Sequence, residues 1–307
     1  MAGKSLLEEG GAKFCQGFDF SIKRSFACAT PFGQPESLDM KPSFCLLLFI
    51  CPWLIRAAEL PRPRHNFIVI AHRGNHSHAH ENTLTALQHA IDAGADYAEI
   101  DVRRTADGHH VLMHDRRVDR MTDGHGSIDQ LTVAQIRQLH VRDAHRPQIP
   151  ADQVPTFEEA LRLIKGRIDI YLDFKDGDRF AVAKAIRAAE VTQQVLVYDD
   201  IESIAEWHRV APELSLIISP PGHVRMPQEL VDFAKKNRIE VLDGPWRNYS
   251  REMVKAANQA GIKIWPDIQN AKEDADYFRR VIDLGLSGVQ TDHPEELSVW
   301  LNQHNLR

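Results

Sequence analysis

Residues 67–102 read FIVIAHRGNHSHAHENTLTALQHAIDAGADYAEIDV, and this stretch decides the fold class. It begins with the apolar run Phe67–Ala71 and ends with a second run, Tyr97–Val102. Between them, apolar residues at helical spacing predict a helix that begins near Asn82-Thr83 and ends at Gly94. A strand, a helix and a second strand of this kind predict a βαβ unit with two parallel strands.

The same alternation continues to the end of the chain. Seven further strand-like runs follow, and most are continuous apolar stretches, as in strands buried on both faces. They are Val111–His114, Ile168–Phe174, Val195–Tyr198, Leu214–Ile218, Ile239–Leu242, Ile262–Trp265 and Gly288–Thr291. Capping boxes begin helices at Thr132 and Thr156. The pattern predicts an α/β fold with a parallel sheet, open or closed, and residues 61–307 are long enough for a (β/α)8 TIM barrel.

The second and third runs are too close together for a parallel pair. About eight residues, including Asp107-Gly108, separate them, whereas a parallel crossover needs about a dozen or more. Asp-Gly is a hairpin signal. Nine runs must also fill eight barrel positions. The sequence therefore predicts either an irregular barrel between strands 2 and 3 or one run that lies outside the barrel.

The first 60 residues form a separate N-terminal extension. Met40-Lys41, the apolar run Phe44–Ile55 and the small residues Ala57-Ala58 predict a secretory signal at about 40–58. We therefore expect translation from Met40 and export to the periplasm or the outside of the cell. The run is too short for a stable membrane span. A buried apolar segment, an uncleaved anchor or a cytoplasmic protein are the alternatives.

Composition narrows the functional classes. All four cysteines lie in the first 51 residues, so the main domain has no disulfide, thiolate metal site or cysteine nucleophile. The formal net charge is −6, so no cationic field attracts nucleic acid. The chain also lacks a Gly-rich dinucleotide motif and a GxxxxGK[ST] phosphate loop. We expect a small-molecule partner and no nucleic acid.

Polar residues of a few types recur at the carboxyl ends of the predicted strands. In chain order they are His72-Arg73, Glu99 with Asp101, His114-Asp115, Asp173 with Lys175, and Asp292. In a (β/α)8 barrel, these strand ends form the catalytic face. We therefore expect the side chains to meet in one site.

Glu99 and Asp101 are two residues apart on one strand, so both side chains point to the same face. Buried neighbouring carboxylates repel each other unless a cation stabilises them, and Asp173 would supply a third oxygen ligand. Oxygen ligands favour Mg2+ or Ca2+. The alternative is that these acids pair with the basic side chains of Arg73, Arg103 and Lys175.

His72 and His114 are candidates for proton transfer, because imidazole titrates near neutral pH. Beside a bound phosphate, one ring would accept a proton from the nucleophile and the other would donate a proton to the leaving alkoxide. Arg73 and Lys175 would neutralise the phosphate oxygens. For either histidine taken alone, a structural role is the alternative.

These motifs continue along the chain in a fixed order and spacing. They are His72-Arg73-Gly74, Glu81-Asn82-Thr83, Gly94-Ala95-Asp96, Glu99–Val102, Thr105, Asp107-Gly108, His114-Asp115, Arg120, Thr122, Gly126, Leu131-Thr132, Pro155–Glu159, Asp173–Lys175 and Thr291–Pro294. The set resembles the glycerophosphodiester phosphodiesterase family over about residues 67–297. This resemblance implies a TIM barrel of the phospholipase C-like phosphodiesterase type. It also implies one divalent cation and hydrolysis of glycerophosphodiesters to sn-glycerol 3-phosphate and an alcohol.

The resemblance also implies residue roles. The acid/base pair would be His72 and His114, the metal ligands Glu99, Asp101 and Asp173, and the phosphate contacts Arg73 and Lys175. Glu81 would orient the site or start the helix rather than bind the ion. Trp265 would be either an apolar platform under the glycerol or ordinary packing at the barrel rim. Residues 116–155 occupy the place of the family's small insertion over the barrel mouth.

Three features depart from the family pattern. Asp173 stands where the family usually has Glu, so its carboxylate would ligate through water or suit a different ion. His80 stands where Pro is usual. His76, His78 and His80 alternate in the loop after the first strand, as either a solvated polar loop or a second metal or substrate site.

Two other functions fit much of the same sequence. A phospholipase C- or D-like phosphodiesterase that acts on intact phospholipid also uses two histidines and acidic residues at strand ends. A non-catalytic barrel that only binds a ligand would be expected to lack one of the two histidines or the acidic pair. The sequence has both histidines and the acidic pair. The Glu-Asn-Thr and Thr-Asp-His-Pro segments favour the glycerophosphodiesterase. The motifs do not encode the headgroup preference, the nucleophile (water or the substrate 2-hydroxyl), the choice of ion or the oligomeric state.

Overall fold

The structure is a computed structural model that describes residues 60–269 and 272–307. The predicted signal at about 40–58 and the four cysteines lie outside the described residues, so export and the start at Met40 stay predictions. Among the described residues, no helix has the length and apolar character needed to span a membrane.

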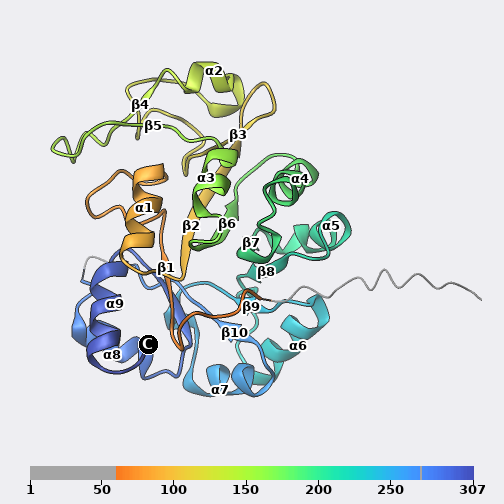
Figure 1. Cartoon of the computed structure of the whole chain (residues 1–307). Coiled ribbons are helices and arrows are strands. Elements are labelled where there is room, and N and C mark those ends of the chain that lie inside the picture. Colours follow the sequence, from red (N-terminus) through yellow and green to blue (C-terminus); the bar gives the residue numbers. More distant parts are fainter. Residues whose placement is uncertain (1–59, 270–271) are drawn as a thin grey trace, which may run out of the picture. The chain divides into compact units, whose positions relative to one another are not determined.

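Within the described residues, eight parallel strands form the central sheet, in the order β10–β9–β8–β7–β6–β2–β1–β11. Their bounds are β1 (Ile68–Ala71), β2 (Tyr97–Arg104), β6 (Asp169–Phe174), β7 (Val195–Tyr198), β8 (Ser215–Ile218), β9 (Val241–Leu242), β10 (Lys263–Ile264) and β11 (Gly288–Thr291). A parallel bridge between Asp267, just after β10, and Gln290 of β11 joins the two edges. The sheet is therefore a nearly closed barrel, and the predicted TIM-barrel fold is confirmed (Figure 1).

A helix lies between each barrel strand and the next, and one follows the last strand. The helices are α1 (Leu84–Asp92), α3 (Phe157–Ile164), α4 (Arg179–Ala189), α5 (Ile204–Val210), α6 (Pro227–Asn237), α7 (Arg251–Gln259), α8 (Ala275–Ile282) and α9 (Pro294–Gln303). Three short 3-10 turns, η2 (Thr192–Gln194), η3 (Ile201–Ser203) and η4 (Trp246–Asn248), lie in the connections. The predicted capping box of Thr156 and Glu159 begins α3. Figure 1 shows the helices around the outside of the strands.

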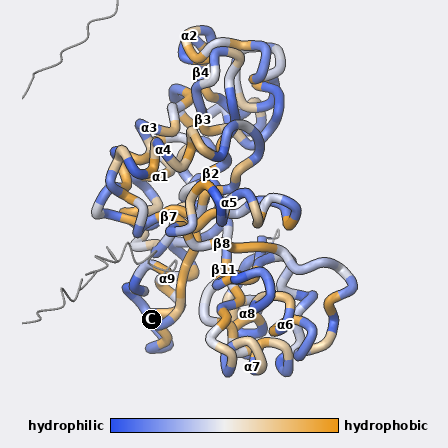
Figure 2. Tube along the Cα trace, turned by 90° about the vertical axis from the view of Figure 1, so that its right-hand side faces the viewer, coloured by the Kyte–Doolittle hydropathy of each residue, from blue (hydrophilic) through white to orange (hydrophobic). Residues whose placement is uncertain are grey.

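Alternate residues of each strand face two different apolar cores. On β1, Val69 packs toward the helices, whereas Ile70 faces the barrel interior, where it lies in one apolar cluster with Tyr97 of β2. Burial on both faces explains the continuous apolar runs, and β8 is accordingly orange in Figure 2. The next inward-facing positions toward the carboxyl ends are His72 after β1 and Glu99 on β2. The interior thus changes from apolar to polar toward the carboxyl ends of the strands.

The third strand-like run lies outside the barrel. β3 (His110–Leu112) pairs antiparallel with the end of β2, with Val102 opposite Leu112. The hairpin signal at Asp107-Gly108 is therefore confirmed, and Gly108 has a positive φ of 85° in that turn. The hairpin also explains why nine strand-like runs supply a barrel of eight strands.

The segment that follows β3 forms a small unit at the end of β2. It contains η1 (Ile128–Gln130), α2 (Val133–Ile136), which begins with the predicted Thr132–Gln135 capping box, and the pair β4 (His140–Val141) and β5 (Asp152–Gln153). Its apolar core is separate from the two barrel cores and consists of Val111, Met113, Val118, Met121, Ile128, Ile136, Val141 and Val154. The Arg146 guanidinium donates to the Ser77 carbonyl at 2.6 Å. Residues 116–155 thus touch the loop that follows β1.

Candidate active site

Three carboxylates converge at the carboxyl end of the barrel. Glu99 and Asp101 lie on the inner face of β2, and β2 pairs in register with β6, which places Asp101 beside Asp173. Ligand oxygens of the three residues all lie within 4.8 Å of one another. Glu99 and Asp101 are buried, with 3% and 1% of their surface exposed, and Asp173 is partly exposed. The pairing register therefore assembles the acidic cluster that the sequence predicts.

The three carboxylates strongly influence one another's ionisation. Burial raises the pKa of Glu99 well above its usual value, and the charges of Asp101 and Asp173 raise it further. Burial and the charge of Asp101 raise the pKa of Asp173 to about 6. Burial would also raise the pKa of Asp101, but the charges of Lys175 and Arg73 outweigh it and lower that pKa. The cluster therefore carries more negative charge than its surroundings stabilise.

Lys175 and Arg73 line the same cluster. The Lys175 ammonium lies 2.5 Å from Asp173 Oδ2 and 3.1 Å from Asp101 Oδ1. The Arg73 amide donates to Glu99 Oε2 at 2.6 Å, and its guanidinium Nε lies 3.5 Å from Asp101 Oδ2. The two sequence hypotheses are therefore compatible, because the acids converge and basic side chains also pair with them.

The donor set fits one divalent cation. All three candidate ligands are carboxylates, which favour a hard ion such as Mg2+ or Ca2+. Two basic side chains face three carboxylates, and one of these bases, Arg73, also pairs with Glu81 at 3.0 Å. The raised pKa values of Glu99 and Asp173 show that this compensation is incomplete. A divalent ion would supply the missing positive charge.

His114 is held from one side by a chain of ion pairs. Its Nδ1 lies 2.8 Å from Asp115 Oδ1, and Asp115 accepts two hydrogen bonds from the Arg120 guanidinium, at 2.6 and 3.0 Å. Arg120 also donates to Glu81, which in turn accepts from Arg73. The predicted orienting role of Glu81 thus agrees with its contacts, which are to two guanidinium groups.

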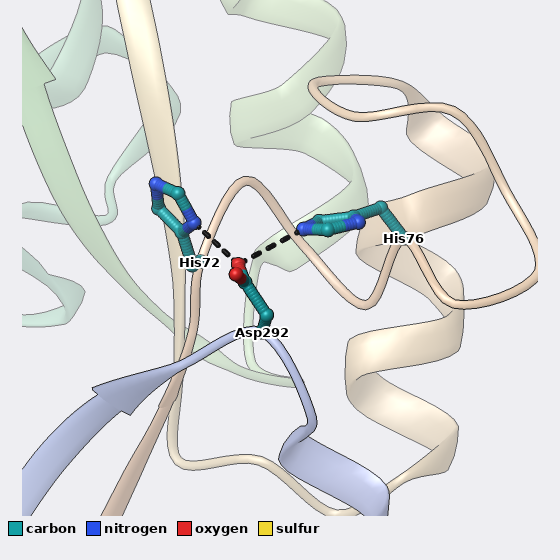
Figure 3. Close-up of side chains that lie close together, drawn as sticks. All are labelled: His72, His76 and Asp292. Carbon is teal, nitrogen blue, oxygen red and sulfur yellow. Dashed lines mark hydrogen bonds and ion pairs between the residues drawn. The ribbon is translucent and has the colours of Figure 1, made fainter. Parts of the chain in front are cut away.

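His72 is held in a similar way. Its Nδ1 lies 2.6 Å from Oδ1 of Asp292, the residue that follows β11, and His76 Nε2 lies 3.2 Å from the same oxygen. Figure 3 shows both rings directing a nitrogen at this carboxylate, while the second nitrogen of His72 points away from it. Burial would raise the pKa of Asp292, but hydrogen bonds from His72 and His76 outweigh it and lower that pKa. In both His72 and His114, Nδ1 is therefore paired with a carboxylate, and Nε2 is the nitrogen that can exchange a proton with a substrate.

Residues 72–296, more than half of the chain, match the sequence profile described as the glycerophosphoryl diester phosphodiesterase family. The chain belongs to this family. The enzyme class predicted from the sequence, a phosphoric diester hydrolase, is therefore confirmed. Members of the family typically use a divalent cation.

One sequence relative and two solved structures of the same fold illustrate the match. A glycerophosphodiester phosphodiesterase from Caldanaerobacter subterraneus subsp. tengcongensis is 29% identical over 245 residues, which cover 75% of this chain and 96% of the relative. The crystal structure of such an enzyme from Agrobacterium tumefaciens has a TM-score of 0.68 at 23% identity and covers 76% of this chain and 99% of that one. A phosphodiesterase from Oleispira antarctica, solved with the product sn-glycerol-3-phosphate, has a TM-score of 0.64 at 23% identity over 76% and 96%.

The three histidines of the loop after β1 separate into three environments in this glycerophosphodiesterase. His76 contacts Asp292, His78 is exposed, and His80 is buried. Burial lowers the pKa of His80, so its ring is favoured in the neutral form. The description as a solvated polar loop therefore holds for His78 alone.

Trp265 agrees with the second of its two predicted roles, ordinary packing. Its ring lies 5.4 Å from the ring of Tyr97, the first residue of β2, and its indole N–H donates to Ser287 at 3.2 Å, just before β11. These neighbours mark the amino ends of the strands, opposite the acidic cluster. Gly288 makes room there, because a Cβ at that position would lie 2.8 Å from the indole. Trp265 therefore packs in the barrel interior rather than forming a platform at the glycerophosphodiesterase site.

Sequence reasoning assigned no catalytic or ligand-binding role to several residues that hold this site. The helix was expected to begin at Asn82-Thr83, and Thr83 is the cap of α1, whereas Asn82 bonds Asp101. Asp292 directly follows β11 and Asp115 lies three residues after the end of β3, so their positions were a usable signal. Arg120 lies in the insertion, and only the family resemblance marked it. The structure thus shows that these residues hydrogen-bond to the predicted site residues and hold them in place.

Proposed function

We propose that the protein hydrolyses glycerophosphodiesters to sn-glycerol 3-phosphate and an alcohol, with His72 and His114 as the acid/base pair. One observation carries the proposal: a buried carboxylate cluster and two carboxylate-held imidazoles lie at the same end of one barrel. Family membership supports the reaction class, and the product bound to the Oleispira relative supports the glycerol phosphate product.

Charge at the site suits a phosphodiester. When one Mg2+ or Ca2+ ion is bound by Glu99, Asp101 and Asp173, it supplies Lewis-acid stabilisation of a phosphoryl oxygen. Lys175 and Arg73 face the same carboxylates, so their positive charges lie where the remaining phosphate oxygens would bind. In this proposal both basic side chains orient the phosphate and stabilise the charge that develops on it.

Proton transfer is assigned to the two Nε2 atoms. One imidazole accepts the proton of the attacking hydroxyl as its oxygen forms a bond to phosphorus. The other donates a proton to the alcohol oxygen as the bond from phosphorus to that oxygen breaks. Asp292 and Asp115 hold the Nδ1 atoms of His72 and His114, and this selects the tautomer and fixes the direction of each ring.

Substrate class is tested by comparing glycerophosphocholine with intact phosphatidylcholine in mixed micelles. We expect release of sn-glycerol 3-phosphate and choline from the first, loss of turnover with EDTA, and recovery when Mg2+ or Ca2+ is added back. Faster cleavage of the intact lipid would assign the protein to the phospholipase-like alternative. Turnover that is indifferent to EDTA would overturn the cation assignment.

The nucleophile is tested separately. Attack by water incorporates one oxygen from 18O-labelled water directly into sn-glycerol 3-phosphate. Attack by the substrate 2-hydroxyl forms a cyclic glycerol phosphate first, which phosphorus NMR detects during single-turnover reactions. A glycerophosphodiester analogue that lacks the 2-hydroxyl distinguishes the two routes, because only direct attack by water hydrolyses it.

A further inference from the structure

We propose that the chain carries a second metal site, formed by His72, His76 and Asp292, for a borderline cation such as Zn2+. We further propose that a cation bound there blocks proton transfer by His72. The binding half stands on geometry alone, whereas the blocking half rests on the proposed function.

Three segments distant in sequence build this site. His72 follows β1, His76 lies in the next loop, and Asp292 follows β11, which pairs with β1. Nδ1 of His72, Nε2 of His76 and a carboxylate oxygen of Asp292 all lie within 4.8 Å of one another. The two rings are 6.2 Å apart and inclined by 71°, so their nitrogens approach the carboxylate from different directions (Figure 3).

The donor set differs in kind from the carboxylate cluster. Two imidazole nitrogens and one carboxylate oxygen form a ligand set typical of Zn2+ and related transition metals, whereas three carboxylates suit Mg2+ or Ca2+. The side chains of His72, His76 and Asp292 are 21%, 22% and 30% exposed, so the site is shielded but reachable. The barrel mouth therefore offers two sites of different chemical preference.

Space beside the three donors allows a complete coordination shell. An open cavity of about 660 Å³ lies next to the cluster, and its lining includes His76, His78 and Asp292. Water entering from this side can occupy the fourth position that three protein ligands leave open. A cation can also reach the donors without passing through the carboxylate cluster.

Hydrogen bonds from two imidazoles to one carboxylate bring the three donor groups together. The contact of 2.6 Å between His72 Nδ1 and Asp292 Oδ1 orients the His72 ring. The second imidazole, His76, lies 3.2 Å from the same oxygen. The two contacts hold three donor atoms within 4.8 Å of one another, and a shared cation among them would replace the hydrogen bonds to Asp292.

Binding at this site has a defined chemical consequence. Coordination uses the Nδ1 lone pair of His72, so the ring proton stays on Nε2. Nε2 then has no lone pair with which to accept a proton, and releasing its proton would require an imidazolate. A cation at Nδ1 therefore removes His72 from acid/base chemistry without touching the phosphate or the carboxylate cluster.

Binding is measured by calorimetric titration of Zn2+ into protein held in excess Mg2+, which occupies the carboxylate cluster. We expect a site that His76→Gln weakens by roughly 100-fold and that the matched control His78→Gln leaves unchanged. Visible absorption of bound Co2+ provides an independent reading of the nitrogen ligands. Equal Zn2+ affinity in the His76→Gln variant and the unaltered chain would overturn the site.

Inhibition is measured on glycerophosphocholine with the same proteins. Zn2+ should inhibit the unaltered chain and His78→Gln over the concentration range of binding, and His76→Gln should retain basal turnover and resist Zn2+. Zn2+ binding that depends on His76 but leaves turnover unchanged would overturn the blocking half and count against His72 as an acid or base. If none of the three proteins turns over glycerophosphocholine even without Zn2+, the proposed function is contradicted. The calorimetric result would still show whether the Zn2+ site exists.

Discussion

Asn82 and Asp101 form a reciprocal pair of hydrogen bonds across the interior of the barrel mouth. The Asn82 amide donates to Asp101 Oδ2 at 2.7 Å, and its carbonyl oxygen accepts from the Asp101 backbone N–H at 3.0 Å. Asn82 has a φ of 57°, a left-handed conformation that asparagine tolerates better than most residues. The pair joins the start of α1 to β2 and orients a carboxylate that we assign to the cation.

Replacing Asn82 with Ala should lower the affinity for the catalytic cation by about 10–100-fold, because a metal ligand would lose the partner that orients it. Isothermal titration with Mg2+ and with Ca2+ measures the change. Asn258→Ala, at an exposed position on α7, is the matched control. Unchanged affinity in the Asn82 variant would show that Asp101 needs no such support or does not bind the ion.

His72→Ala and His114→Ala should each lower kcat by about 10²–10⁴-fold while the fold is retained, because each removes one proton-transfer group. Steady-state kinetics on glycerophosphocholine, together with circular dichroism, measure both properties. His125→Ala is the control, since His125 lies in the insertion and its side chain is 86% exposed. Near-normal turnover in either variant would remove that histidine from the mechanism.

Arg120→Gln should lower kcat by roughly 10-fold and change cation affinity little. The guanidinium of Arg120 holds Asp115, and Asp115 holds Nδ1 of His114, so its loss would loosen the imidazole without touching a metal ligand. Kinetics and cation titration on one preparation separate the two effects. Arg117→Gln is the control, because within residues 60–269 and 272–307 the Arg117 side chain pairs only with exposed Asp119. An equal loss in both variants would contradict a positioning role for Arg120.

Asp169 should make the protein less stable as the pH rises. Burial raises its pKa to about 6, above the usual value of 3.8, so its protonated form is favoured in the folded state. Its favourable contribution is complete below about pH 4 and is lost as the pH rises through 6. The Asp169→Asn side chain stays neutral at every pH. The difference in unfolding free energy, variant minus original chain, should therefore increase by about 1 kcal/mol from pH 5 to pH 7.5.

Urea denaturation at the two pH values, with EDTA present, measures the Asp169 effect. Asp276→Asn serves as the control, because the side chain of Asp276 is 85% exposed and should show no such difference. A stability difference between Asp169→Asn and the original chain that does not change with pH would contradict the argument.

Much of the fold followed from local patterns in the sequence. The runs at Val195–Tyr198 and Gly288–Thr291 became strands with those same bounds, and the capping box at Thr156 began α3. Such signals are local, because backbone hydrogen bonding and side-chain periodicity act over a few residues. The same logic identified Glu99 and Asp101 as neighbours on one face of one strand.

The sequence by itself therefore determined the alternation of strands and helices in a parallel sheet, the hairpin signal at Asp107-Gly108 and the chemical types of the site residues, and the family resemblance added the closed barrel. Only the tertiary structure decided which of these side chains touch: Asn82 with Asp101, His72 and His76 with Asp292, and Trp265 with Tyr97 at the opposite end. Local spacing specifies the face of a strand on which a residue lies. Contacts between strands depend on pairing register and on space left by neighbours, such as the missing side chain of Gly288, and these arise only when the whole barrel closes.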